Sequence, residues 1–275
     1  MEFIIKSKAL YTTWVFYKPN RILFDTGEGI SDELGNKIYG IEKIFFTHAH
    51  VDHIAGLWGI INTRNNAMGS RDKKLEIYFP KGSTNIIEYI NFINKMNKRL
   101  RYEVDYIELN LSDKIDINSK RFIKPFKTRH SPGEISYGYQ ILEKRRRLKK
   151  EYRDLPQEKI KNLIVNEKVD ILEDFCANIL TISGDSLPIP PEFAKDCDTL
   201  IHECTFFDES DRKIRNHTSL RELQRLIKET NPKRLIIYHV SSRYNSKINE
   251  VKLLLTREFP KTEIEIIHPD KVMKI

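Results

Sequence analysis

The sequence Thr47-His48-Ala49-His50-Val51-Asp52-His53 places three imidazoles and a carboxylate within a single short run. Neutral imidazole nitrogens and carboxylate oxygens are ligands that suit Zn²⁺. If the run leaves a strand in an extended form, His48 and His50 point to the same side, and Asp52 and His53 face elsewhere. The run therefore offers two pairs of ligands to two neighbouring positions, as two-metal hydrolysis requires.

The residues on either side of this run predict its place in a fold. The apolar segment at residues 41–46 precedes it, and the apolar residues of 54–61 can line one face of a helix. This order of strand, loop and helix puts the candidate ligands at the carboxyl end of a strand, where open α/β folds place their chemistry. A histidine-rich surface tract that picks up metal adventitiously is the alternative, and the ordered setting disfavours it.

Short apolar segments recur along the whole chain, first in runs and then in alternation with helical patterns. This order indicates an α/β fold with two sheets and helices on their outer faces. Strands are predicted at residues 3–5, 14–17, 21–25, 41–47, 75–79, 102–109, 121–128, 135–143, 178–183, 198–203, 234–240 and 263–268. Helices are predicted at 53–64, 83–99, 156–165, 190–196, 217–230 and 246–258.

The overall composition is that of a globular protein. A chain of 275 residues fits a layered α/β enzyme built as one unit, so we expect a single domain over residues 1–275. No apolar run approaches the roughly 20 residues that span a bilayer, and the amino end shows no secretory signal. The sequence therefore predicts a cytoplasmic protein that does not enter a membrane.

Basic residues exceed acidic ones, 47 to 39, for a net charge of +8 and a sequence pI near 9.2. Such a balance favours approach to a polyanion. A run of basic residues, Lys144-Arg145-Arg146-Arg147-Leu148-Lys149-Lys150, opens a short, basic, irregular insertion at about 144–175. The run is either a solvated surface or a phosphate-contacting patch that includes Arg145, Arg146 and Arg147, and the pattern alone does not decide between them.

Several motifs resemble those of the metallo-β-lactamase fold superfamily. They are the H-x-H-x-D-H run, Asp25-Thr26-Gly27-Glu28-Gly29 upstream and Gly184-Asp185-Ser186 downstream. Three further stretches resemble ribonuclease Z, a tRNA 3′-processing endonuclease, in the right order: Ser136-Tyr137-Gly138-Tyr139 after His130, His202-Glu203-Cys204-Thr205-Phe206, and His239-Val240-Ser241-Ser242-Arg243-Tyr244. The resemblance implies a four-layer αββα sandwich of two mixed sheets.

The resemblance also implies a site for two Zn²⁺ per chain, in which Mn²⁺ or Fe²⁺ could replace zinc. Asp185 would bridge the metals, although a turn aspartate is the alternative at this Gly-Asp-Ser sequence. Asp25 would orient a ligand imidazole from behind, and His202 would give structural support. The first metal would take His48, His50, His130 and Asp185, and the second would take Asp52, His53, Asp185 and His239.

The catalytic residues that the resemblance implies are Asp52, His217 and Glu203. His217, supported by Glu203, would donate a proton to the leaving group. The alternative is that His217 only begins the predicted helix at 217–230 after Asn216 as a possible N-cap, and both roles can hold at once. Ser241 and Arg243 are candidate phosphate contacts, and an exposed loop without a role is the alternative.

The implied function is that of a zinc-dependent phosphodiesterase, an endoribonuclease that removes the 3′ trailer of precursor tRNA through a metal-bridging hydroxide. A homodimer is expected by analogy. Two family features, a Gly-rich turn near residues 8–13 and a long Gly-Pro-rich arm, are not evident. Either the segment at 144–175 clamps the tRNA, or the protein is a hydrolase of a small phosphodiester, thioester or lactone.

Overall fold

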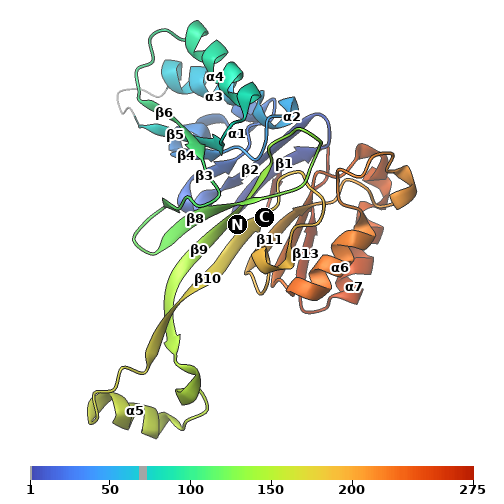
Figure 1. Cartoon of the computed structure of the whole chain (residues 1–275). Coiled ribbons are helices and arrows are strands. Elements are labelled where there is room, and N and C mark those ends of the chain that lie inside the picture. The colour runs from blue at the N-terminus through green and yellow to red at the C-terminus, as the bar shows by residue number, and fades with distance from the viewer. Residues whose placement is uncertain (1, 68–72) are drawn as a thin grey trace.

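Two seven-stranded sheets lie face to face with helices on their outer faces (Figure 1), which confirms the predicted αββα sandwich. The computed structural model describes residues 2–67 and 73–275. The first sheet has the spatial order β14 (Met273–Lys274), β1 (Phe3–Lys8), β2 (Thr12–Tyr17), β3 (Ile22–Phe24), β4 (Lys43–Phe45), β5 (Leu75–Pro80) and β6 (Val104–Leu109). The second has the order β13 (Glu263–Ile266), β12 (Arg234–Tyr238), β11 (Thr199–Glu203), β10 (Leu172–Ile182), β9 (Tyr137–Leu148), β8 (Arg121–Lys127) and β7 (Ile115–Asp116).

Helices bury the outer face of each sheet. The helices on the first sheet are α1 (Ile30–Leu34), α3 (Leu57–Ala67) and α4 (Thr84–Met96), and those on the second are α6 (Leu220–Thr230) and α7 (Ile248–Glu258). Short 3₁₀ helices lie at Lys18–Asn20, Gly35–Gly40, Lys150–Tyr152, Pro191–Phe193, Glu209–Asp211 and Ser242–Lys247. None of the helices within the described ranges is both long and apolar enough to cross a membrane.

Aromatic side chains join the two sheets near the histidine run. Phe45 on β4 stacks on Tyr78 of the same sheet, with ring centroids 4.6 Å apart, and meets Tyr139 of the opposite sheet at 5.3 Å. The Tyr139 hydroxyl donates a hydrogen bond to the carbonyl of Phe46, directly before the run. The inter-sheet core therefore fixes where the run leaves its strand.

The helix predicted at 53–64 is interrupted. It forms two helices, α2 (Val51–Ile54) and α3, because the backbone around Gly56 bonds to the loop after β3 instead of continuing the helix. The N–H of Gly56 donates to the carbonyl of Thr26, and the N–H of Thr26 donates to the carbonyl of His53, both at 2.6 Å. This close contact ties the end of the histidine run to the neighbouring strand.

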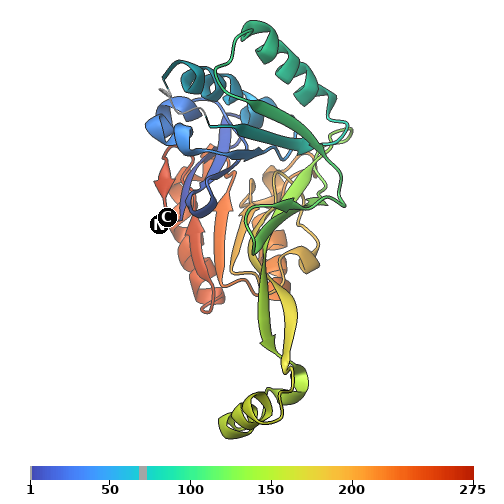
Figure 2. The ribbon, with the colours of Figure 1, turned by 90° about the vertical axis from the view of Figure 1, so that its left-hand side faces the viewer.

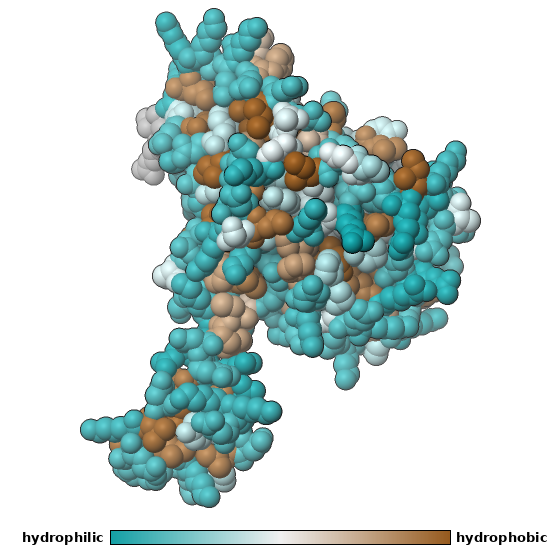
Figure 3. Space-filling view, viewed as in Figure 1, coloured by the Kyte–Doolittle hydropathy of each residue, from teal (hydrophilic) through white to brown (hydrophobic). Residues whose placement is uncertain are grey.

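Residues 144–175 form an arm that projects from the sandwich (Figures 1 and 2). Strands β9 and β10 continue well beyond the predicted 135–143 and 178–183 and pair as a hairpin that carries α5 (Gln157–Val165) at its end. The sequence hid these strands because most of their cross-strand pairs contain a charged residue, such as Arg147 opposite Glu173 and Arg145 opposite Phe175, so no apolar alternation marks them. At the tip, apolar side chains lie among hydrophilic ones (Figure 3), and Val165 is 60% exposed.

The helix predicted at 190–196 shortens to the 3₁₀ turn Pro191–Phe193. The helix does not continue because Asp196 has φ 51°, in the left-handed region, and its N–H donates to the carbonyl of Thr230 outside the turn.

Gly56→Ala tests the contact between α2 and the loop after β3. An added Cβ would lie 2.3 Å from the carbonyl oxygen of Gly27 and 2.7 Å from that of Thr26. Because both atoms belong to the backbone, we expect a loss of about 1–3 kcal/mol in the free energy of unfolding, measured by denaturant titration. Gly40→Ala is the control, since a Cβ there would meet nothing within 4 Å. Equal stability of the two variants would contradict this account.

Candidate metal centre

All seven residues predicted as metal ligands meet at one edge of the sandwich, where strands of both sheets end. Their ligating atoms form overlapping groups within 4.8 Å of one another. The first sheet supplies the histidine run after β4, and the second sheet supplies single residues after β8, β10 and β12. The groups are His48 with His50 and His130, His48 with His53 and Asp185, and Asp52 with His53 and His239.

Asp185 lies at the centre of this cluster. Its Oδ2 is 3.0 Å from Nε2 of His239, 3.3 Å from Nε2 of His53 and 4.0 Å from Nε2 of His48. Asp52 completes one side, with Oδ2 3.6 Å from Nε2 of His239. On the other side, Nε2 of His130 lies 3.1 Å from Nδ1 of His50. The arrangement gives one carboxylate access to two adjoining sets of imidazoles.

Hydrogen bonds from behind determine which nitrogen of each imidazole faces the cluster. Nδ1 of His53 donates to Oδ2 of Asp25 at 2.7 Å. The hydroxyl of Thr47 donates to the same Asp25 oxygen, so Nδ1 of His48 donates to that hydroxyl, at 2.9 Å. Both Nε2 atoms then point inward, and they are the nitrogens that can bind a metal once they carry no proton.

His239 is oriented in the same way by the second sheet. The Thr205 hydroxyl donates to the carboxylate of Glu203, so it accepts the Nδ1 proton of His239 at 2.9 Å. Nδ1 of His130 donates to the carbonyl of Asn216 at 3.1 Å. The outer nitrogens of four of the imidazoles therefore have a partner, and their Nε2 atoms are available as ligands.

Several inward-facing polar atoms of the cluster are buried without a hydrogen-bond partner in the described structure. They are Nε2 of His48, His53 and His239, and Oδ1 of Asp185. An unsatisfied buried polar atom typically costs about 1–3 kcal/mol. Four such atoms within one cluster, all of types that coordinate divalent cations, fit a metal centre.

The electrostatics of the cluster favour an ionised central carboxylate. Burial would raise the pKa of Asp185, but the imidazoles of His239 and His53 outweigh burial and hold the pKa well below its usual range. Burial lowers the pKa of His48 well below its usual value, and the neighbouring His53 lowers it further. A charged carboxylate beside a neutral imidazole is the protonation pattern that metal binding needs.

Two residues of the site have an unusual backbone conformation. Asp25 has φ 58° and His239 has φ 57°, in the left-handed region that residues other than glycine seldom adopt. The N–H of Asp25 donates to the carbonyl of Phe45, and the N–H of His239 donates to the hydroxyl of Ser7. These bonds hold both side chains toward the cluster at the expense of local strain.

His217 and Glu203 form a pair beside the cluster. Nδ1 of His217 lies 3.0 Å from Oε1 of Glu203, and the His217 ring stacks on that of His239. Burial alone would lower the pKa of His217, but the Glu203 carboxylate outweighs burial and raises the pKa to about 9. Glu203 is fully buried and also accepts backbone N–H bonds from Ser186, Thr205 and Thr218. A positioned imidazolium of this kind can donate a proton.

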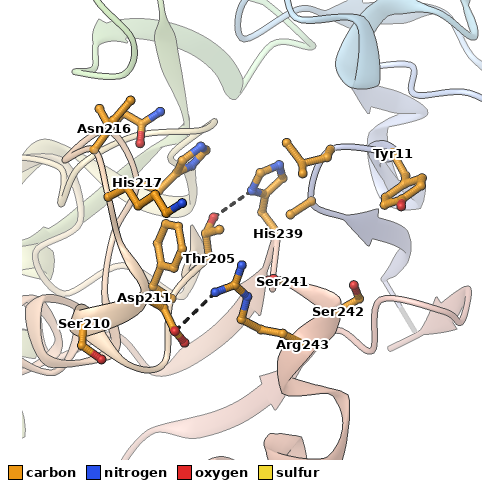
Figure 4. A pocket seen from close by; sticks show the side chains of 15 residues that line it. Tyr11, Thr205, Ser210, Asp211, Asn216, His217, His239, Ser241, Ser242 and Arg243 are labelled. Atoms are coloured by element: carbon orange, nitrogen blue, oxygen red, sulfur yellow. Dashed lines mark hydrogen bonds and ion pairs between the residues drawn. The ribbon is translucent and has the colours of Figure 1, made fainter.

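A cleft of about 860 Å³ opens onto the His217 ring of this pair (Figure 4). His217, His239, Ser241 and Arg243 all line it, and Nη1 of Arg243 lies 3.4 Å from Oδ1 of Asp211. The structure thus places the predicted phosphate contacts Ser241 and Arg243 beside the candidate metal centre.

Other predicted site residues lie outside the cluster. His202 is buried behind it, and its Nδ1 donates to the carbonyl of Glu203 at 2.7 Å. Arg145, Arg146 and Arg147 lie on the stalk of the arm, and each pairs with a carboxylate there. The partners are Glu143 for Arg145, Asp170 for Arg146 and Glu173 for Arg147.

The residues that position the candidate ligands from behind were not predicted from the sequence. The hydroxyls of Thr47 and Thr205 each link a buried carboxylate to an imidazole by hydrogen bonds. The hydroxyl of Ser7 accepts the backbone N–H of His239, and Oε1 of Glu134 accepts the N–H of Ala49 inside the run. Thr47 and Thr205 lie within quoted motifs, which was the available signal. Ser7 and Glu134 gave none, because their partners are distant in sequence.

Comparisons with known proteins agree with this geometry. Residues 20–149 match the β-lactamase superfamily domain. Ribonuclease Z of Ligilactobacillus salivarius is 31% identical over an alignment that covers 88% of this chain and 83% of that protein. Ribonuclease Z of Staphylococcus carnosus is 29% identical, with 89% of this chain and 86% of that protein covered.

Solved structures agree on the fold. Human tRNase Z, short form, superposes with a TM-score of 0.67 at 21% identity, covering 100% of this chain and 99% of that chain. The metallo-β-lactamase fold protein YhfI from Bacillus subtilis has a TM-score of 0.68 at 16% identity, with 99% and 98% covered. The protein is a hydrolase of the metallo-β-lactamase fold in which histidine and aspartate side chains cluster as a candidate metal site. By its sequence identity over most of its length, the chain belongs to the ribonuclease Z family of the metallo-β-lactamase superfamily.

Proposed function

We propose that the protein is a metal-dependent endoribonuclease that removes the 3′ trailer from precursor tRNA. The observation that carries this proposal is the His217–Glu203 pair at the cleft, 3.0 Å apart and beside the ligand cluster, in a chain of the ribonuclease Z family. Cleavage of a phosphodiester releases an alkoxide, which leaves more readily with a proton donor. In the hydrolysis of a thioester, lactone or lactam, a His217–Glu203 pair next to Arg243 would have no evident role.

The proposed cofactors are two Zn²⁺ per chain, with Mn²⁺ or Fe²⁺ as possible replacements. His48, His50, His130 and Asp185 would hold one ion, and Asp52, His53, Asp185 and His239 the other. Divalent cations bound there would supply an activated water and stabilise negative charge on the phosphate. Asp52, as a ligand at the mouth of the site, belongs to the proposed catalytic set together with His217 and Glu203.

The residues of the chain have separate tasks in this proposal. Ser241 and Arg243 bind the phosphate in the cleft. Glu203 keeps the Nδ1 proton on His217, and the imidazolium presents a second proton from Nε2 to the leaving oxygen. Because His217 is 14% exposed, its proton is replaced from solvent after each turnover. His202 supports the backbone of Glu203 from behind.

The arm is the second part of the proposal. It projects from the sandwich, as a clamp on a large RNA would, and we propose that it binds the tRNA body in a homodimer. Its three stalk arginines are each paired with a carboxylate, so an RNA phosphate must exchange with those carboxylates to contact Arg145, Arg146 or Arg147.

His217→Ala tests the proton donor. We expect both metals to be retained and turnover of a precursor tRNA to fall roughly 10²- to 10⁴-fold. Metal content is measured by elemental analysis and cleavage by gel electrophoresis. His268→Ala is the matched control, because this eighth histidine lies outside the cluster. Cleavage by His217→Ala at the parental rate would refute the assignment.

Asp185→Ala tests the central carboxylate. The variant leaves several imidazoles without the carboxylate that lies between them, so we expect the purified protein to lose metal. The exposed Asp174 supplies the control Asp174→Ala, which should retain the parental metal content. If elemental analysis found full metal in Asp185→Ala, the bridging role would be wrong.

Removal of the arm tests its role in tRNA binding. Lys144 and Cys176 pair directly across the hairpin, so an Asn-Gly turn can join them in place of residues 145–175. We expect the Kd for precursor tRNA to rise roughly 100-fold, because one of two linked contacts is lost. Hydrolysis of bis(p-nitrophenyl) phosphate should stay unchanged. Unchanged tRNA affinity would show that the arm does not clamp the substrate.

A further inference from the structure

The most exposed large apolar side chains of the described ranges gather around the candidate metal centre. Leu10 is 86% exposed, Val51 73%, Ile214 67% and Tyr11 61%. Leu10, Tyr11 and Ile214 line the cleft, and Val51 directly precedes Asp52 in the histidine run. We call these four residues the apolar rim. Single exposed apolar residues are ordinary, but a cluster beside a site marks a binding surface.

The turn between β1 and β2 holds its part of the apolar rim in a defined position. Leu10 has φ 72°, which is unfavourable for leucine, and the N–H of Tyr11 donates to the carbonyl of Lys8. The ammonium of Lys8 lies 4.8 Å from the centre of the Tyr11 ring and 2.8 Å from a carboxylate oxygen of Asp270. Lys8 is therefore fixed by an ion pair and holds the ring from one side.

Tyr11 lies on the wall of the cleft opposite His217 and Asp211 (Figure 4). Two cationic side chains, Arg243 and Lys213, line the cleft against one carboxylate, Asp211, which lies 3.4 Å from Arg243. A ligand that fills this cleft therefore meets positive charge within it and apolar surface at its edge. A nucleotide has matching parts, a phosphate and a flat base that stacks on aromatic rings.

Only an unpaired nucleotide can use both parts. In duplex RNA the bases are stacked and paired inside, so a protein meets mainly phosphates and ribose hydroxyls. The base of an unpaired nucleotide can be turned outward and packed on an aromatic or apolar side chain. A second copy of this chain would also cover the apolar rim, but it would bring no phosphate to Arg243 and Lys213, which line the cleft.

We propose that the apolar rim is a platform for one unpaired nucleobase of the RNA, next to the phosphate that is cleaved, and that Tyr11 is its stacking surface. This inference rests on the proposed function, because it takes RNA as the substrate. Base stacking tolerates any base, so the apolar rim selects for unpaired RNA at the cleavage site and not for a sequence. Tyr11 is a positioning residue in this role.

The experiment is a thermodynamic cycle that combines removal of the Tyr11 ring with removal of the nucleobase. Metal-loaded parental protein and Tyr11→Ala are titrated with a fluorescent precursor RNA, and with the same RNA carrying an abasic ribose next to the cleaved phosphate. Fluorescence anisotropy gives each Kd over a period in which gels show intact RNA. We expect Tyr11→Ala to weaken binding of the normal RNA roughly tenfold and to leave binding of the abasic RNA unchanged. Tyr11→Phe keeps the aromatic ring and should bind both RNAs as the parent does.

Phe92→Ala, which removes an exposed aromatic ring on α4, is the control and should not distinguish the two RNAs. If Tyr11→Ala changed the Kd of both RNAs equally, or of neither, the inference would be overturned. Cleavage by the parental protein would still support the proposed function in that case. Loss of a dimer in Tyr11→Ala by sedimentation, without base dependence, would show that the apolar rim is a contact between copies. Base-dependent binding without cleavage would support the platform and refute the nuclease.

Discussion

The carboxylate of Asp25 anchors both ends of the histidine run. Buried at the end of β3, it accepts bonds from the backbone and hydroxyl of Thr47, the first residue of the run, and from Nδ1 of His53, the last. Three bonds to one charged group are stronger than bonds between neutral groups. They also leave Nε2 of both His48 and His53 directed inward. The orientation of two candidate ligands of the first sheet, His48 and His53, follows from this anchor.

Glu203 has the corresponding part in the second sheet. Its buried carboxylate accepts bonds from the chain after β10, from Thr205 and from the loop that carries His217. Through the Thr205 hydroxyl it also orients His239. The same carboxylate therefore positions a candidate ligand and the candidate proton donor. Each sheet contributes one buried carboxylate that orients imidazoles, and Asp185 lies where the two sets meet.

The molecule separates chemistry from recognition. The candidate metal centre lies where strands of both sheets end, and the inter-sheet core holds it through contacts such as the bond between Tyr139 and Phe46. The arm and the apolar rim are built differently. The arm is a charged hairpin that leaves the sandwich, and the apolar rim consists of exposed side chains on turns and helix ends. In the proposed function, these outer parts decide which RNA reaches the metals.

The sequence by itself determined the layered fold, most of its elements and the candidate ligands. Apolar periodicity reflects burial, and the histidine run is local, so both are visible along one stretch of chain. The fold class is confirmed, whereas the ligand assignments stay predictions that the geometry supports. Thr205 and Glu203 were visible in a motif, but the bond from Thr205 to His239 depends on two strands meeting.

Only the tertiary structure decided the features that depend on partners distant in sequence. The arm was hidden because most cross-strand pairs of its hairpin contain a charged residue, so its strands carry no apolar alternation. The break at Gly56 arises from contact with the backbone of Thr26 and Gly27, and the role of Ser7 from its bond to His239. The apolar rim brings Leu10 and Ile214 to one cleft. Proximity of this kind is a property of the folded chain, since no local pattern encodes which distant segments meet.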